Sequence, residues 1–173
     1  NNLNPTRGML FDVKAGINVD KDDLGSAFGY IMPKLGFYNS LSRDRKLVLK
    51  TLVQATVNIG DDFQFYQSAQ LGQNNGLRGY RTQRFSGESA FATSADVRYS
   101  FNEFKTGLVP LQMGIFLGAD VGRVWFDGED SKRWNNDVGG GFWINSSEAI
   151  GATFNLFAGE DGPRFSFQVG FSF

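Results

Sequence analysis

The amino-acid sequence predicts an all-β protein that crosses a membrane as an antiparallel transmembrane β-barrel. Apolar residues recur at every second position in eight separate segments, which is the period of a strand with two different faces. Most segments run about ten residues or more, near the length that crosses a bilayer at a tilt. The opposite face of each segment mixes Gly, Asn, Ser, Asp and Lys, as the wet interior of a barrel requires.

The first three segments establish the pattern. Residues 9–19 set Met, Phe, Val and Ile against Asp, Lys, Gly and Asn. Residues 30–38 alternate more weakly, and Pro33 within them predicts a bulge or a strand edge, because proline cannot donate to a ladder. Residues 47–59 alternate clearly and place Lys50 on the polar face. A slip of one residue would turn Lys50 toward lipid, which costs about 2–4 kcal/mol at the midplane, so this register is well specified.

The other five segments follow one long polar stretch. Residues 91–101 carry Asp96 and Arg98 on their polar face, and residues 111–121 carry Asp120. Short turns alternate with longer polar loops, as periplasmic turns and external loops do in outer-membrane barrels. The last three segments are 138–145, 150–156 and 165–173.

The alternative fold is a soluble β-sandwich, whose strands also alternate. The length of the strands and the plain apolar face favour the barrel instead. Aromatic residues near the expected strand ends are typical of interfacial belts, although aromatic residues are common in strands of every kind. These belt candidates are Tyr30, Tyr38, Tyr99, Phe101, Trp125, Phe126 and Trp134.

The long polar stretch, at about residues 60–89, is expected to be an external loop with a function. A plain hairpin needs only two to five residues, whereas this loop holds a cluster of glycine, arginine and aromatic residues at 76–85. A solvated, mobile loop is the alternative.

Composition excludes several classes of function. Lys and Arg total 17 against 18 for Asp and Glu, so nucleic acid is not an expected partner. Cys and His are absent, which removes thiol catalysis and the commonest ligands of zinc. No nucleophile elbow or phosphate-binding loop is present, so neither an enzyme nor a cofactor is expected. The acidic stretches 20–23 and 127–130 do not complete a calcium-loop pattern, and no metal site is expected there.

Motifs along nearly the whole chain resemble one family in the correct order. Leu77-Arg78-Gly79-Tyr80 resembles the (Val/Ile/Leu)-Arg-Gly-(Phe/Tyr) signature of the BamA/TamA-type outer-membrane assembly and translocation superfamily, which includes the transporters of two-partner secretion. Together the ordered motifs are a specific signal. The other motifs that carry the resemblance are Pro-Thr-Arg-Gly at 5–8, an acidic-x-Arg motif at Asp96 and Arg98, a Phe-x-Asp-x-Gly-type motif at Asp120 and Gly122, and a C-terminal barrel signal at Phe171 and Phe173. In the third of these, Gly118 replaces the usual aromatic residue.

The resemblance implies a position for the loop. In the family the signature loop folds back into the barrel and its arginine contacts acids on the two following strands, which here pairs Arg78 with Asp96 and Asp120. The alternation independently assigns both aspartates to the interior. A buried arginine without its partner costs about 3–5 kcal/mol and an exposed pair is worth about 0–1, so the pairing matters only in a confined interior. The alternative is that both aspartates face water.

Two architectures stay open on this reasoning. One is a small closed barrel of eight strands, and the other is the C-terminal half of a sixteen-stranded barrel, the size that the resemblance implies. Side chains only just fill an eight-stranded interior, which leaves no room for the loop. Residues 1–173 are expected to form a single domain in which nothing resembles the periplasmic POTRA domains of the family.

The implied function is the insertion or translocation of proteins in the bacterial outer membrane, with membrane lipid and client outer-membrane proteins as partners. The alternative is a structural barrel that anchors or exports a fused soluble domain. The upstream sequence distinguishes the two hypotheses, because POTRA repeats favour the first and a hydrolase domain favours the second.

Overall fold

The computed structural model describes residues 5–19, 27–60, 67–105, 110–126, 128, 132–146 and 150–171. Eight long strands dominate these residues and confirm the all-β prediction. Among the same residues, no helix is long and apolar enough to cross a membrane. The long strands are β1 (Gly8–Val19), β2 (Ala27–Ser40), β3 (Leu47–Ile59), β6 (Ser89–Ser100), β8 (Pro110–Trp125), β9 (Asn135–Ser146), β10 (Ile150–Gly159) and β11 (Gly162–Phe171).

Three shorter strands complete the secondary structure of the described residues. A small hairpin, β4 (Ala69–Leu71) and β5 (Phe85–Gly87), forms a separate sheet inside the long loop. The strand β7 (Phe104–Lys105) pairs with the start of β8. The alternation did not predict these strands, because two or three residues are too few to show a period.

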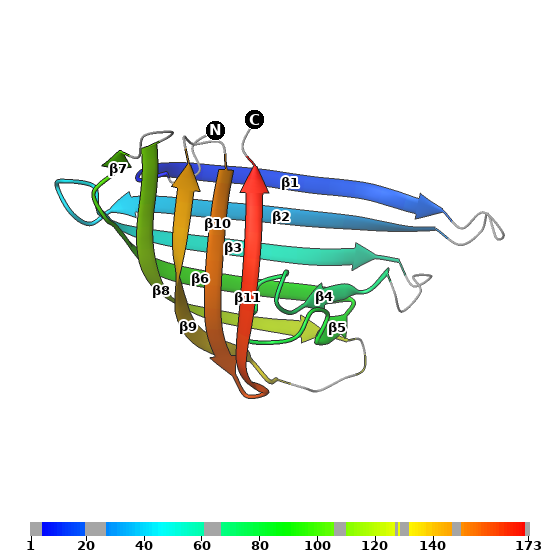
Figure 1. Cartoon of the computed structure of the whole chain (residues 1–173). Coiled ribbons are helices and arrows are strands. Elements are labelled where there is room, and N and C mark those ends of the chain that lie inside the picture. Colours follow the sequence, from blue (N-terminus) through cyan, green and yellow to red (C-terminus); the bar gives the residue numbers. More distant parts are fainter. Residues whose placement is uncertain are drawn as a thin grey trace.

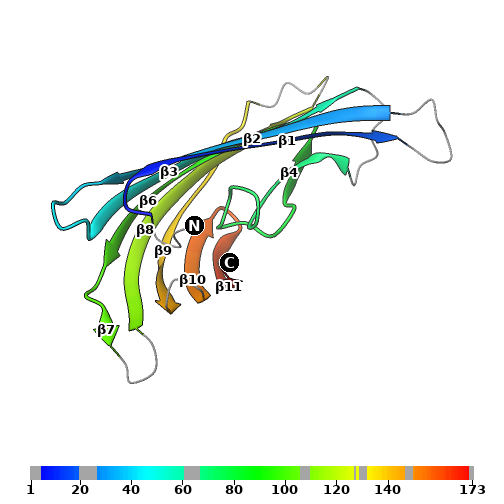
Figure 2. The ribbon, with the colours of Figure 1, turned by 90° about the horizontal axis from the view of Figure 1, so that it is seen from above.

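The long strands form one antiparallel sheet in the order β1-β2-β3-β6-β8-β9-β10-β11. The sheet curls into a trough, and the loop between β3 and β6 lies on its concave side (Figures 1 and 2). Among the described residues, β1 pairs only with β2 and β11 only with β10, so the ring is open. This arrangement is consistent with part of a larger barrel.

Register keeps each face continuous across the sheet. On the convex face, apolar partners lie opposite each other, as Phe11 and Leu35 do between β1 and β2, and Phe142 and Phe154 between β9 and β10. Many of these side chains are open to the surroundings, with Ile17 at 76% and Leu117 at 73% exposure. Polar and charged side chains occupy much of the concave face, together with a buried aromatic cluster of Phe116, Trp143 and Phe157. The predicted assignment of the two faces is therefore confirmed.

Pro33 produces a different irregularity from the expected bulge or edge. It lies in an interior strand and pairs with Val13 of β1. Toward β3, paired residues run from Ile31 with Val57 to Lys34 with Gln54, and no pairing is present between them. The register is unchanged across this gap, so no residue is inserted. Proline interrupts the ladder because it has no N–H to donate.

Three consecutive glycines, Gly139, Gly140 and Gly141, lie in the middle of β9. A Cβ atom at Gly139 would lie 2.2 Å from the carbonyl oxygen of Leu156, and one at Gly141 would lie 1.9 Å from that of Phe154. Adjacent strands therefore approach β9 more closely than any side chain would permit.

Aromatic clusters occur at both ends of the strands. Trp134 packs edge-on against Trp125 at 6.2 Å and against Phe91 at 6.1 Å between ring centroids. Tyr99 and Phe101 form a second pair, 5.6 Å apart. The belt prediction is wrong for two of its residues. Tyr30 and Tyr38 lie on the concave face, because they alternate in β2 with the outward residues. Tyr30 lies opposite Gly16 of β1, and Tyr38 lies opposite Lys50 of β3.

Candidate functional site

The long loop is folded and packs against the concave face. Its described part, residues 67–88, contains the β4–β5 hairpin and a turn in which Tyr80 N–H donates to the Leu77 carbonyl. Leu77 is 0% and Tyr80 1% exposed, and both join a buried apolar cluster with Ala90 and Ala92 of β6. The loop therefore has its own core against the wall of the trough, unlike a mobile surface loop.

Glycines allow the motif to reach the wall. Gly76 has a φ of 88°, a left-handed conformation that other residues rarely adopt. A Cβ atom at Gly79 would lie 2.6 Å from the Cβ of Asp137 and 2.8 Å from the amide nitrogen of Gly159. The motif backbone thus rests directly on β9 and β10.

Arg78 joins the loop to two strands. Its Nη2 donates to Asp96 Oδ1 and to Asp120 Oδ1, each at 2.6 Å, and its Nε donates to Asp120 Oδ2 at 2.8 Å. The backbone N–H of Arg78 also donates to Asp120 Oδ2, at 3.0 Å. This is the pairing that the resemblance implies. Bidentate, charge-assisted contacts of this kind are among the strongest hydrogen bonds in proteins.

The surroundings of Arg78 strengthen these contacts. Its guanidinium lies 4.0 Å from the ring centroid of Phe157 and 5.9 Å from that of Phe116. Burial alone would lower the pKa of Arg78, but the hydrogen bonds and charges of Asp120 and Asp96 raise it above its ordinary value. The guanidinium is therefore charged, and in this structure it binds both carboxylates.

Tyr80 forms a second attachment of the loop. Its hydroxyl donates to the Asn136 carbonyl at 3.0 Å and accepts from the Glu160 N–H at 3.3 Å. Its ring covers Gly159, where a Cβ atom would lie 2.7 Å from ring carbons. Tyr80 thereby fixes the motif to β9 and to the turn between β10 and β11.

Arg84 provides a third attachment, nearer the surface. Its Nε donates to Asp161 Oδ2 in the β10–β11 turn at 2.7 Å. The same guanidinium lies 5.1 Å from the ring centroid of Phe85, and the Phe85 ring packs edge-on against Tyr80. The exposed end of the loop is thus tied to the same turn as Tyr80.

The other predicted residues surround this attachment without all touching Arg78. Lys50 Nζ lies 3.7 Å from Asp96 Oδ2 and shares that carboxylate with Arg78. Arg98 packs against Trp143 instead, with its guanidinium carbon 5.4 Å from the ring centroid. Gly122 makes room for Leu71 of the hairpin, since a Cβ atom there would lie 3.0 Å from Leu71 Cδ1.

Gly118, where the family motif has an aromatic residue, lies beside the charged cluster. A Cβ atom at this position would lie 2.1 Å from Asp96 Oδ1 and 2.9 Å from Arg78 Nη2. The space that a side chain would need is occupied by the ion pair. An aromatic ring contacts the guanidinium from Phe116, two residues earlier on the same face.

The predicted C-terminal barrel signal, Phe171 and Phe173, is described only in part. Phe171 is the last residue of β11 and pairs with Ile150. Phe173 lies outside the described residues, as do the acidic residues at 20–23 and at 127, 129 and 130. The structure does not bring Phe171 near the motif.

Asp137 is a site residue that the sequence reasoning missed. It lies opposite Asp120 in the β8–β9 register, is 2% exposed and sits under Gly79. Extending the β9 alternation by one residue would have placed it on the interior face. Phe116 and Phe157 were missed because the interior face was expected to be polar.

A comparison with protein-family models decides the classification. The model of the Omp85 superfamily domain matches residues 1–173. The chain belongs to the Omp85 superfamily. Searches of curated proteins and of solved structures found no match. The family resemblance inferred from the motifs is confirmed, and membership together with the all-β fold points to an outer-membrane β-barrel concerned, in general terms, with protein insertion or translocation.

Proposed function

We propose that this Omp85 domain inserts or translocates polypeptides at the bacterial outer membrane, without catalytic chemistry. The observation that carries the proposal is the attachment of the loop by Arg78 to Asp96 and Asp120 on the interior wall. A loop fixed in this way limits the space through which a polypeptide passes, and its release enlarges that space.

The two faces of the sheet support a position in the membrane. The convex face carries exposed apolar residues on every long strand, including Ile31 and Phe165, whereas the concave face carries Asp96 and Lys50. Apolar area on this scale is unusual for a soluble surface and matches the hydrocarbon of a bilayer. Membrane lipid is therefore the proposed partner of the convex face.

The edges of the sheet support a role with other polypeptides. In the described residues, β1 and β11 each use one side for pairing and leave the other side open. An open edge presents a row of N–H and C=O groups that can pair with an added strand. Gly170 of β11 pairs with Gly151, so little side-chain packing reinforces this end of the sheet.

Substitution of Arg78 in the full-length protein tests the proposal. In Arg78→Ala, Asp120 loses its cation and we expect a destabilisation of about 3–5 kcal/mol, because a buried charge is left unpaired. Arg78→Lys keeps the charge but not the bidentate contact and is expected to cost about 1.5–3 kcal/mol. The readouts are the thermal unfolding midpoint in detergent and the outer-membrane proteome of cells that carry each variant.

Arg81→Ala is the matched control, because Arg81 lies in the same loop and is exposed. We expect this variant to keep both stability and client levels. If Arg78→Ala leaves the unfolding midpoint and every outer-membrane protein at the wild-type level, the proposed role of the loop is wrong.

A further inference from the structure

Among the described residues of the eight long strands, Arg123 is the one charged residue on the convex face. Register links one set of outward positions across the sheet, and this set includes Phe11 of β1 and Val121 of β8. Val124 packs inward against the buried cluster of the loop, so its neighbour Arg123 points outward. A charged group on a surface that faces hydrocarbon is rare and generally has a function.

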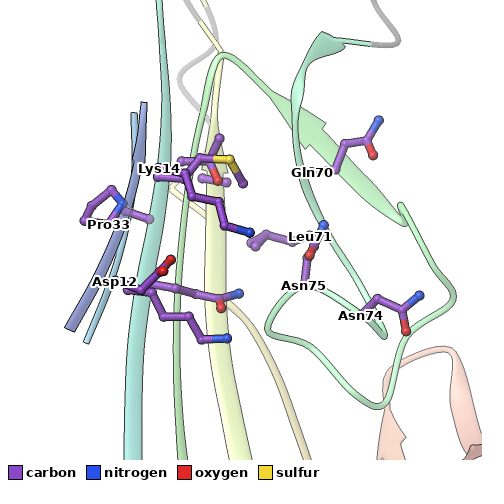
Figure 3. A pocket seen from close by; sticks show the side chains of 13 residues that line it. Asp12, Lys14, Pro33, Gln70, Leu71, Asn74 and Asn75 are labelled. Carbon is purple, nitrogen blue, oxygen red and sulfur yellow. The ribbon is translucent and has the colours of Figure 1, made fainter. Parts of the chain in front are cut away.

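The other charged residues of the long strands lie on the concave face. Asp12, Lys14 and Lys34, for example, line a pocket of about 170 Å³ between the first two strands and the loop. In Figure 3, Lys14 extends from β1 toward Leu71 of the loop. Along the described strands, the arrangement thus keeps charge away from the lipid side except at Arg123.

Arg123 lies near the end of β8, at the level expected for lipid headgroups. Leu117 is in the middle of this strand, and the six residues from it to Arg123 span about 20 Å. At a tilt of about 40° this length gives about 15 Å of height, just beyond half of the ~25 Å apolar band of a barrel. Ser89, the first residue of β6, pairs with Trp125, so this end of the sheet carries the long loop.

Aromatic rings surround the Arg123 side chain. Its guanidinium carbon lies 5.0 Å from the ring centroid of Trp125, and Phe91 of β6 lies opposite it in register. Trp134 packs edge-on against the rings of both Trp125 and Phe91. A guanidinium contacts a ring through its face, whereas its N–H donors lie in its plane, where a phosphate can accept two of them.

We propose that Arg123, Trp125 and Trp134 form a site for the phosphate of a lipid headgroup at the end of the barrel that carries the loop. These residues share the convex face with Leu117, which is 73% exposed, so the molecule that contacts them is the one that covers this face. Tryptophan suits the boundary between acyl chains and headgroups, and Arg123 supplies the cation that a phosphate binds. The inference rests on the outer-membrane position in the proposed function and does not depend on the passage of polypeptides.

Retention of lipid by the full-length protein tests the site. The protein is folded into phosphatidylcholine vesicles that contain a minor fraction of lipid A, a phosphorylated glycolipid, or of its dephosphorylated form. It is then extracted in mild detergent, and native mass spectrometry measures the lipid that stays bound. Arg123→Gln removes the charge, and Arg81→Gln makes the same change at an exposed position of the loop.

We expect the wild type and Arg81→Gln to retain lipid A at least about tenfold better than its dephosphorylated form, because one charge-assisted contact has that effect or more. Arg123→Gln should retain the two forms equally. An undiminished preference for lipid A in Arg123→Gln would overturn the site. Binding of inorganic phosphate to the protein in neutral detergent, with the same dependence on Arg123, would assign the site to a free anion and overturn the lipid.

Arg123→Lys distinguishes a phosphate contact from a structural role. Lysine keeps the charge but not the planar fork, so an intermediate preference for lipid A is expected. In a detergent without phosphate, both Arg123 variants should have the unfolding midpoint of the wild type. A lower midpoint for Arg123→Gln, with equal loss of both lipid forms, would show that Arg123 supports the fold and would refute the site.

These outcomes are separate from those of the proposed function. If Arg78→Ala leaves client levels unchanged, the insertion or translocation role fails, whereas the preference for lipid A is still expected. If the wild type does not insert into vesicles at all, the membrane position fails and the lipid site fails with it.

Discussion

At the scale of single residues, glycine and aspartate determine how closely the loop can approach the wall. Gly79 is in contact with both β9 and β10, and Asp137 lies directly beneath it. Asp120 and Asp137 face each other across β8 and β9, and of these two carboxylates Arg78 hydrogen-bonds only that of Asp120. The site therefore combines a tight steric fit with two facing carboxylates, of which Arg78 hydrogen-bonds one.

Gly79→Ala is expected to destabilise the docked loop by about 1–3 kcal/mol, the usual cost of an overpacked contact. The added methyl group would overlap the Cβ of Asp137 and the backbone of Gly159. The thermal unfolding midpoint in detergent measures the effect. Gly170→Ala is the control, because a Cβ atom there has no neighbour within 4 Å. Equal midpoints for the two variants would contradict the tight fit.

Asp137→Asn is expected to stabilise the protein. The change keeps the shape of the side chain and removes one of two facing carboxylates, which repel each other when both are charged. A gain of about 1 kcal/mol corresponds to an increase of roughly 2–4 °C in the unfolding midpoint for a chain of this size. A lower midpoint would show that the Asp137 carboxylate itself supports the loop.

At the scale of elements, the sequence predicts what depends on alternation. All eight long strands and the orientation of Asp96 and Asp120 follow from a period of two. The β4–β5 hairpin could not be predicted, because its strands are too short to show a period and form only where the loop packs on β6 and β8. Asp137 was missed because the start of β9 lies next to a polar loop, where the boundary of a strand is hard to place.

The attachment of the loop to the β10–β11 turn is expected to weaken in acid. The hydrogen bond from Arg84 holds the pKa of Asp161 below its ordinary value. A carboxyl with a lowered pKa stabilises the fold above its ordinary pKa of about 3.9, and this contribution is lost as the pH falls through the lowered value. A spin label on Thr82→Cys should therefore become more mobile as the pH falls through the lowered pKa of Asp161.

The Asp161→Asn protein is the control for this measurement. With no carboxyl to titrate at position 161, its spin label should show the more mobile spectrum at every pH. Equal mobility of the label in the parent protein and in Asp161→Asn at neutral pH would show that Tyr80 and Arg78 hold the loop without the contribution of Arg84.

At the scale of the whole molecule, the two faces of the trough have opposite requirements. The convex face needs apolar side chains at every second position, and the concave face tolerates charge. Whether the ring closes could not be predicted from the sequence, because closure depends on tilt and stagger of all the strands together, and alternation reports neither. The structure shows an open trough whose concave side already contains the folded loop (Figure 2).

A charge on the convex face is expected to impair folding into lipid. Leu117→Lys places an ammonium group on an outward position of β8, at a cost of about 2–4 kcal/mol near the midplane. Gln168→Lys makes the same change of charge on the concave face of β11 and should fold normally. The folded fraction in lipid vesicles is measured by heat-modifiable gel mobility. Equal yields for the two variants would contradict the orientation of the sheet in the membrane.

The run of glycines in β9 has a mechanical consequence for this arrangement. Because the neighbouring strands crowd against Gly139 and Gly141, bulkier residues would force them apart and flatten the curvature of the wall. A flatter wall would carry Gly159 away from the ring of Tyr80 and Asp137 away from Gly79, although neither contact involves the glycine run itself. The glycine run therefore shapes the docking surface of the loop through the backbone of β9 and through Phe157 and Phe116, which pack against Gly139 and Gly141.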